Sequence, residues 1–246
     1  MKTYGLIGYP LGHSFSKGYF TDFFRQKGID AEYKNFELPH IEALTDVLQT
    51  ESTLQGFNVT IPYKQQIFPY LSELDDAAQA IGAVNVVKVI CHNEKRYLKG
   101  YNTDYIGFSD SIRPYLKSHH THALILGTGG ASKAVAYALQ QLGLKTRFVS
   151  RTSREDIISY DELTPELMTQ YTVIVNTTPL GMHPKVDECP PLDYTLLTSQ
   201  HLLYDVVYNP AKTLFLQRGE AAGATICNGM DMLIGQAKAA WKIWEE

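Results

Sequence analysis

The sequence has few cysteines and no long apolar run, and these shortages exclude several classes of protein. Cys91, Cys189 and Cys227 are odd in number and far apart, so they form neither a disulfide framework nor a zinc-binding spacing. No apolar run reaches the length that spans a membrane. The first residues enter a strand without a charged segment before it, so we expect no signal peptide. The chain is therefore predicted to be cytoplasmic, with no membrane partner.

The sequence also lacks a strong charge of either sign. Its net charge is −4 and it has no cluster of lysine and arginine, so a nucleic-acid partner is not expected. His119, His120 and His122 resemble a metal-binding tract, but they fall between a helical stretch and a strand, which favours a solvated loop. There is no internal repeat and no low-complexity linker. With 246 residues, the chain can form one large or two ordinary domains.

Apolar strands alternate with helices along the first hundred residues. Short apolar runs at residues 3–8, 33–36 and 56–59 predict strands, and apolar residues at helical spacing separate them. This alternation is typical of a mostly parallel sheet with helices on both faces. Residues 86–90 and 95–99 can pair as a hairpin. The first part of the chain is therefore expected to be an α/β domain.

The strongest single signal is the glycine-rich turn within ALILGTGGASKAVAYA, residues 123–138. An apolar strand at 123–126 precedes Gly127, Gly129 and Gly130, and an amphipathic helix follows from about Ser132. Glycines let backbone N–H groups approach a pyrophosphate at a helix N-terminus. With a further strand at 145–150, the pattern favours a dinucleotide-binding βαβ unit. The alternative is an ordinary tight turn between a strand and a helix.

The end of that second strand indicates which dinucleotide is bound. NAD-binding proteins place an acidic residue there for the ribose 2′-hydroxyl, whereas an arginine accommodates the 2′-phosphate of NADP. Here the strand ends at Ser150, and Arg151 and Arg154 follow, while Asp156 comes too late. The sequence therefore favours NADP. The alternative is an exposed basic loop with no ligand.

Polar loops follow the predicted strands of the first half, where α/β sheets bind ligands. Their hydroxyl, amide, lysine and carboxylate groups suit a small, polyhydroxylated, acidic ligand. Ser14 and Ser16, two residues apart in an extended chain, are expected to point the same way and to share one carboxylate. Capping of a turn is the alternative for these two serines, and the spacing by itself favours it.

Lys64 and Asp104 both follow hydrophobic strands and lie in polar loops. A partly buried lysine can act as a general acid when its surroundings lower its pKa, and a carboxylate can hold it in position. A plain ion pair of little energetic value explains the two residues equally well.

Taken together, these segments resemble the shikimate/quinate dehydrogenase family over nearly the whole chain. The shared motifs are, in order, the Ser-x-Ser loop, GFNVTIPYK (56–64), IGAVN (81–85), GYNTDYIGF (100–108), GTGGASKAV (127–135), SRT (150–152), NTTPLGM (176–182), DVVYNP (205–210) and GMDMLIGQA (229–237). The chain departs from the usual family pattern at Lys17, Tyr19-Phe20-Thr21, Ser150 and Asp231, but none of these changes removes a proposed substrate contact.

The resemblance implies a role for each matching residue. Lys64 would be the principal catalytic residue, with Asp104 as its partner. The implied substrate-binding residues are Ser14, Ser16, Thr60, Lys64, Asn85, Asp104, Tyr208 and Gln236. The implied cofactor-binding residues are Asp76, Gly127, Thr128, Gly129, Gly130, Ala131, Ser150, Arg151, Thr152, Arg154, Asn176, Val206 and Gly229. No metal is implied.

The resemblance also implies the architecture and the reaction. It implies two α/β domains: an N-terminal, mostly parallel substrate domain (1–104 plus 230–246) and a Rossmann NADP-binding domain (105–229), with the C-terminal helix returning to the first. The implied reaction is the reversible, NADPH-dependent reduction of 3-dehydroshikimate to shikimate, on the route to chorismate and the aromatic amino acids, by a monomer or homodimer. The rivals are a sister dehydrogenase that acts on quinate or on both acids, with NAD as an alternative cofactor, a folate-linked methylene dehydrogenase, and a non-catalytic sensor or binding module.

Overall fold

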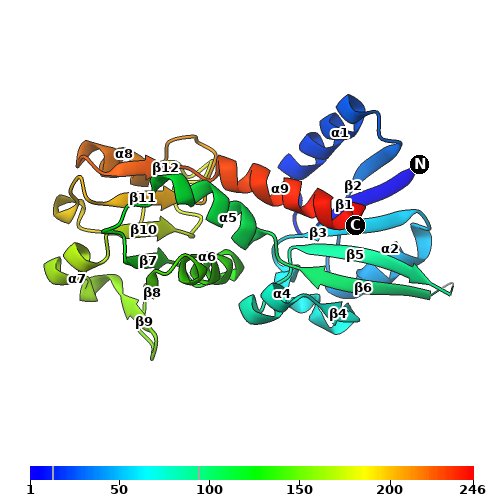
Figure 1. Cartoon of the computed structure of the whole chain (residues 1–246), viewed down its shortest axis with the longest axis horizontal. Coiled ribbons are helices and arrows are strands. Elements are labelled where there is room, and N and C mark those ends of the chain that lie inside the picture. The colour runs from blue at the N-terminus through cyan, green and yellow to red at the C-terminus, as the bar shows by residue number, and fades with distance from the viewer. Residues whose placement is uncertain (13, 94) are drawn as a thin grey trace. The chain divides into compact units, whose positions relative to one another are not determined.

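The computed structural model describes residues 1–12, 14–93 and 95–246, which form two compact units (Figure 1). Unit 1 comprises Met1–Thr103 and Ala237–Glu246, and unit 2 comprises Asp104–Gln236. Each unit holds one six-stranded sheet with helices packed on it. The predicted α/β class is therefore confirmed. The functional division at residues 104–105 and 229–230 stays a prediction.

The sheet of unit 1 has the order β2-β1-β3-β5-β6-β4. Strand β1 pairs in parallel with β2 and β3, and β4 pairs in parallel with β6. The pairs β3/β5 and β5/β6 are antiparallel, the latter as the expected hairpin. Its strands are β1 (Lys2–Gly8), β2 (Ala31–Glu37), β3 (Leu54–Val59), β4 (Glu73–Leu74), β5 (Val86–His92) and β6 (Lys95–Tyr101). Its α-helices are α1 (Phe15–Lys27), α2 (Leu44–Thr50), α3 (Tyr63–Gln66) and α4 (Asp76–Ile81).

Aromatic side chains fill the core between this sheet and the helices α1 and α9 (Met230–Glu245). Tyr4 and Phe20 pack against Trp244 from the C-terminal half of α9, and the Trp244 indole N–H donates to the carbonyl of Val87 at 3.0 Å. The absence of a side chain at Gly56 makes this possible, because a Cβ there would lie 2.3 Å from the Trp244 indole nitrogen. The end of the chain is thereby fixed in unit 1, as the family resemblance implied.

The sheet of unit 2 has the order β12-β11-β10-β7-β8-β9, and its neighbouring strands are all paired in parallel. Counted from the first strand of this unit, that order is the arrangement of the Rossmann fold, in which ligands bind where the strand order reverses. Its strands are β7 (His122–Leu126), β8 (Lys145–Ser150), β9 (Ile157–Ser159), β10 (Val173–Asn176), β11 (Leu202–Asp205) and β12 (Thr225–Cys227). Its complete α-helices are α5 (Asp104–Ile112), α6 (Gly130–Gln141), α7 (Pro165–Gln170) and α8 (Leu214–Ala221).

Several local expectations were wrong or incomplete. The polar region after Ser150 contains the short elements β9 and α7, which carry too few apolar residues to reveal a period. The histidines do not form a solvated loop throughout: His120 is only 7% exposed. Its Nδ1 accepts the backbone N–H of Lys117 at 3.0 Å, and burial lowers its pKa. Within the described part of the chain, there is no group of three or more His, Cys, Asp or Glu side chains that could hold a metal ion.

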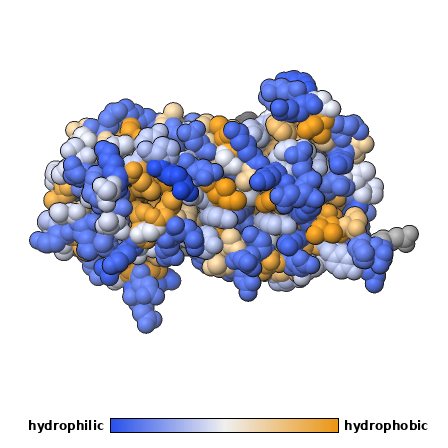
Figure 2. Space-filling view, in the orientation of Figure 1, coloured by the Kyte–Doolittle hydropathy of each residue, from blue (hydrophilic) through white to orange (hydrophobic). Residues whose placement is uncertain are grey.

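The described helices are all too short or too polar to cross a membrane. On the face of the molecule drawn in Figure 2, hydrophilic residues predominate and hydrophobic ones occur in small separate groups. In both units the apolar side chains are instead buried on both faces of each sheet.

Candidate active site

The two serines predicted to hold a carboxylate lie at the N-terminus of α1. Ser14 is the N-cap residue in extended conformation, and its Oγ accepts the N–H of Lys17 at 3.3 Å. Ser16 is already inside the helix, so the expectation that both serines belong to an extended segment was wrong. Both the turn-capping alternative and a carboxylate site suit this position, because the free N–H groups and the dipole of a helix N-terminus favour an anion.

Asn85 is the centre of a buried polar junction in unit 1. It is 2% exposed, its Oδ1 accepts the N–H of Thr103 at 2.7 Å, and its Nδ2 donates to the Thr103 hydroxyl at 3.1 Å. The neighbouring Asn102 donates its side-chain amide to the carbonyl of Ala83 at 2.9 Å. These bonds hold the loop after β6 against the segment before β5, and so fix the position from which Asp104 follows.

The same junction includes the loop that carries Lys64. The N–H of Val84 donates to the carbonyl of Lys64 at 2.8 Å, so α3 is tied to the residue before Asn85. Thr60, at the end of β3, donates its N–H to Ile7 at 2.9 Å. The structure therefore brings the backbones of Lys64, Asn85 and Thr103 together. Asp104 is buried at the start of α5, and its pairing with Lys64 stays a prediction.

The glycine turn of unit 2 leads directly into the N-terminus of α6. Gly127 has φ +107°, and a Cβ there would lie 2.9 Å from the Thr177 hydroxyl, so a larger residue is excluded by both strain and contact. Gly129 is the N-cap of the twelve-residue helix α6, and a Cβ on it would meet no atom within 4 Å. An open, glycine-lined helix N-terminus fits the phosphates of a dinucleotide. Thr128, Gly130 and Ala131 complete this turn.

The residues predicted to select NADP follow β8. Ser150 is the last residue of the strand, and Arg151, Thr152 and Arg154 are exposed beyond it. No acidic residue ends the strand. Two exposed guanidinium groups at this place fit the 2′-phosphate of NADP, and the adjoining glycine turn makes a ligand-free basic loop the weaker explanation.

A buried aspartate that sequence reasoning missed joins two other predicted cofactor segments. Asp205 has no exposed surface, and its Oδ1 accepts the side-chain amide of Asn176 and the N–H of Val207, both at 3.0 Å. Its Oδ2 accepts the Thr213 hydroxyl at 2.5 Å. Burial raises the pKa of this carboxyl to about 6. Its position at the end of a buried strand was the available signal.

Val206 and Gly229, predicted to lie along the cofactor, are in direct contact. A Cβ on Gly229 would fall 2.1 Å from the carbonyl oxygen of Val206, and the Gly229 N–H donates to Val207 at 3.3 Å. Only glycine permits this approach of two backbones. Asn176, Asp205, Val206 and Gly229 therefore form one rigid group at the carboxyl ends of β10, β11 and β12.

Three predicted residues lie apart from these groups. Asp76 is exposed in the first turn of α4 in unit 1, where Asp75 is the cap and accepts the N–H of Ala78. Tyr208 is partly buried after β11. Gln236 lies on α9, with its backbone beside Gly107: a Cβ on Gly107 would be 2.7 Å from the Gln236 nitrogen. The roles of Asp76, Tyr208 and Gln236 stay predictions.

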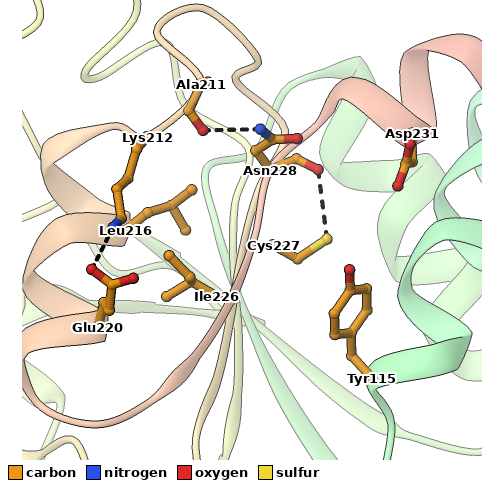
Figure 3. Close-up of a pocket in the computed structure, with 9 residues that line it drawn as sticks. All are labelled: Tyr115, Ala211, Lys212, Leu216, Glu220, Ile226, Cys227, Asn228 and Asp231. Atoms are coloured by element: carbon orange, nitrogen blue, oxygen red, sulfur yellow. Dashed lines mark hydrogen bonds and ion pairs between the residues drawn. The ribbon is translucent and has the colours of Figure 1, made fainter.

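A hollow of about 320 Å³ in unit 2 contains none of the predicted site residues (Figure 3). Cys227 and Tyr115 line it, and the Lys212–Glu220 ion pair lies along one side. Burial raises the pKa of the Cys227 thiol to about 11, so this cysteine is unreactive at neutral pH. The hollow has no observation that assigns it a ligand.

Comparison with known proteins identifies the family. Residues 6–87 match the shikimate dehydrogenase substrate-binding domain. The chain is 38% identical to Shikimate dehydrogenase (NADP(+)) from Clostridium beijerinckii over 256 residues, covering 100% of this chain and 93% of that protein. It is also similar to a crystal structure of shikimate dehydrogenase in complex with NADP+, with 32% identity, a TM-score of 0.86, and coverage of 99% and 89% of the two chains.

A further solved structure holds both ligands of the expected reaction. Shikimate 5-dehydrogenase from Thermus thermophilus, in complex with NADP(H) and shikimate, is 29% identical with a TM-score of 0.85, and the match covers 99% of this chain and 93% of that one. A quinate dehydrogenase from Corynebacterium glutamicum in complex with NAD has 26% identity and a TM-score of 0.86. On the full-length sequence matches above 30% identity, the chain belongs to the shikimate dehydrogenase family.

Proposed function

We propose that the chain catalyses the reversible reduction of 3-dehydroshikimate to shikimate with NADPH, on the route to chorismate and the aromatic amino acids. The observation that carries this proposal is the match to NADP-dependent shikimate dehydrogenases along 100% of the chain. The local geometry agrees with it, because the buried Asn85–Thr103 junction is tied to the segment of Lys64 within unit 1, and the glycine turn suits a dinucleotide.

Most of the residues that would bind the acid belong to unit 1, while Asp104, Tyr208 and Gln236 belong to unit 2. Ser14 and Ser16, at the N-terminus of α1, would hold the substrate carboxylate with help from Tyr208. The ring hydroxyls would be held by Thr60, Lys64, Asn85, Asp104 and Gln236. Asn85 Oδ1 accepts the Thr103 N–H and its Nδ2 donates to the Thr103 hydroxyl, so the side chain is held in one orientation at this position.

Lys64 would act as the general acid at the reacting oxygen. As the ketone carbon is reduced, its oxygen gains negative charge, and an ammonium group next to it both stabilises that charge and supplies the proton. Asp104, buried at the start of α5, would hold the ammonium in position. In the reverse direction Lys64 would accept the hydroxyl proton.

Unit 2 would bind NADP, which supplies the hydride when bound. The turn at Gly127, Thr128, Gly129, Gly130 and Ala131 would contact the pyrophosphate. Ser150, Arg151, Thr152 and Arg154 would bind the 2′-phosphate, and Asn176, Val206 and Gly229 would line the rest. Asp76, which belongs to unit 1, would be a further contact. The rigid group around Asp205 supports this assignment, because it fixes three of these segments relative to one another.

Steady-state rates with shikimate or quinate and with NADP or NAD test the proposal. Shikimate with NADP should give a kcat/KM at least tenfold above each of the other three pairs. A preference for quinate and NAD would instead support the function of the similar quinate dehydrogenase. Absence of turnover with all four pairs, together with binding, would indicate a sensor.

We also propose a cytoplasmic location and a monomer or homodimer. The three cysteines are all free, which suits a reducing compartment. Cell fractionation with a cytoplasmic marker tests the location. Light scattering at two protein concentrations tests the oligomeric state.

A further inference from the structure

The carboxylate of Asp205 is bonded to both ends of one loop in unit 2. This loop, residues 206–212, lies between Asp205, the last residue of β11, and Thr213, the N-cap of α8. At the near end, Asp205 Oδ1 accepts the N–H of Val207 at 3.0 Å. At the far end, Oδ2 accepts the hydroxyl of Thr213 at 2.5 Å. Asp205 and Thr213 have no exposed surface, so one buried carboxylate closes the 206–212 loop.

The middle of the 206–212 loop is bonded to two other segments of unit 2. The carbonyl of Asn209 accepts the N–H of His183 at 3.1 Å, from the segment that follows β10. The carbonyl of Ala211 accepts the side-chain amide of Asn228 at 2.9 Å, from the segment that follows β12 (Figure 3). Since β10 and β12 are the two neighbours of β11 in the sheet, these bonds hold the loop at the carboxyl edge of that sheet.

The bonds around Asp205 require two acceptor oxygens. The N–H of Thr178 can only donate, so it marks the oxygen of the Asn176 side chain, and the Asn176 nitrogen must face Asp205 Oδ1. In the same way, the N–H of Leu216 donates to the Thr213 oxygen at 3.5 Å, so the hydroxyl hydrogen of Thr213 points at Oδ2. An ionised carboxylate meets this requirement, whereas an amide offers only one acceptor oxygen.

The 206–212 loop carries two residues with proposed ligands: Val206 for the cofactor and Tyr208 for the acid. We propose that Asp205 and Thr213 are positioning residues that hold this loop in the conformation that binds NADP and the acid. Both side chains are fully buried, so they act through Val206 and Tyr208 and not by contact with a ligand. The inference rests on the proposed function, which gives Val206 and Tyr208 their ligands.

Thr213→Val tests the proposal, because it removes the hydroxyl and keeps a side chain branched at the same carbon. The Kd for NADP, measured by calorimetry, and the KM for shikimate should each rise about tenfold, as expected for one lost hydrogen bond to a charged group. The value of kcat should stay within about threefold of wild type, because Thr213 does not touch the reacting atoms. A rise of less than about twofold in either constant, or an effect confined to kcat, overturns the inference.

Two further variants separate positioning from stability. Thr213→Ser keeps the hydroxyl and should restore both constants to within about twofold of wild type. Thr164→Val is the matched control: Thr164 is the N-cap of α7, and its oxygen accepts the N–H of Leu167 at 3.3 Å. No residue of α7 has a proposed ligand, so Thr164→Val should lower the melting temperature through the lost cap and leave both constants unchanged. Equal effects of Thr164→Val and Thr213→Val on the two constants overturn the inference.

Asp205→Asn provides the second measurement. It replaces one acceptor oxygen by a donor, so it should also raise both constants, and adding Thr213→Val should raise them no further, because the two residues act through one bond. Effects that multiply in the double variant overturn the inference. Failure of the wild type to oxidise shikimate with NADP rejects the proposed function itself. An active wild type with unchanged constants in Thr213→Val rejects this inference alone.

Discussion

The carboxylate of Asp205 and the side-chain amide of Asn176 form a buried hydrogen bond of 3.0 Å between the ends of two neighbouring strands, β11 and β10. The same carboxylate accepts the N–H of Val207 and the hydroxyl of Thr213. Three donors thus surround an acid that has no exposed surface. They only partly offset the cost of burying its charge, so the pKa rises from 3.8 to about 6.

This raised pKa predicts a pH-dependent stability. The native state holds the Asp205 proton at a pH where the unfolded chain has lost it, so native stability falls as pH rises from about 4 to 6. The contribution is about 3 kcal/mol over that window. Asp205→Asn cannot ionise, so the stability of this variant relative to wild type should rise by about that amount between pH 4 and pH 6. Urea unfolding at each pH measures it.

An exposed carboxylate gives the opposite sign and serves as the control. Hydrogen bonds from Thr195 lower the pKa of Asp193 in the folded state. The stability that Asp193 contributes is therefore fully present above its unfolded-state pKa and is lost as the pH falls through its folded-state pKa. Asp193→Asn should therefore lose stability relative to wild type as pH rises. Parallel stability curves for wild type and Asp205→Asn would contradict the assignment of the raised pKa to Asp205.

The strands and the glycine turn could be predicted from the sequence because their signals are local. Apolar runs bounded by turn residues identify β1, β7 and β10, and the glycines at 127–130 can be recognised without tertiary contacts. One recognisable βαβ segment was enough to predict a parallel sheet in unit 2, because the remaining strands of this unit are also paired in parallel.

What could not be predicted depends on partners distant in sequence. Tyr33 is a plausible core residue in any strand, and only the fold brings it to Asn58, 25 positions later. Asp205 ends an apolar strand, but nothing near it in the sequence shows that Thr213 and Asn176 enclose its carboxylate. The spacing of Ser14 and Ser16 fits both an extended chain and a cap, and only the structure shows that Ser14 caps α1, so that Ser16 lies inside the helix.

Two glycines in unit 1 should respond oppositely to alanine. A Cβ on Gly56 would lie 2.3 Å from the Trp244 indole, so Gly56→Ala should destabilise the protein by about 1–3 kcal/mol through overpacking. Gly18 lies inside α1 with no atom within 4 Å of its Cβ position, so Gly18→Ala should stabilise by about 0.5–1 kcal/mol. Denaturant unfolding measures both. Equal effects would show that the packing of Trp244 on Gly56 is not as described.

Lys64 is the residue on which turnover should depend most. Lys64→Ala removes the proposed proton donor and should lower kcat about 10²–10⁴-fold, the usual contribution of a general acid, with a modest change in KM. Lys95→Ala removes an exposed lysine from β6 and should leave both constants unchanged. The measurement is initial rates at saturating NADPH. If Lys64→Ala keeps a near-normal kcat, Lys64 is not the general acid.

Cofactor choice should depend on Arg151. The 2′-phosphate distinguishes NADP from NAD, so removing a guanidinium group that binds it weakens NADP selectively. Arg151→Ala should raise the KM for NADP about tenfold, as expected for a lost hydrogen bond to a charged group, and should leave the KM for NAD unchanged. Arg113→Ala, which alters an arginine after α5, should leave both values unchanged. The Arg151 effect should shrink at high salt, because an exposed ion pair is screened. An equal loss with both cofactors would mean that Arg151 acts through the fold of the loop and not through the phosphate.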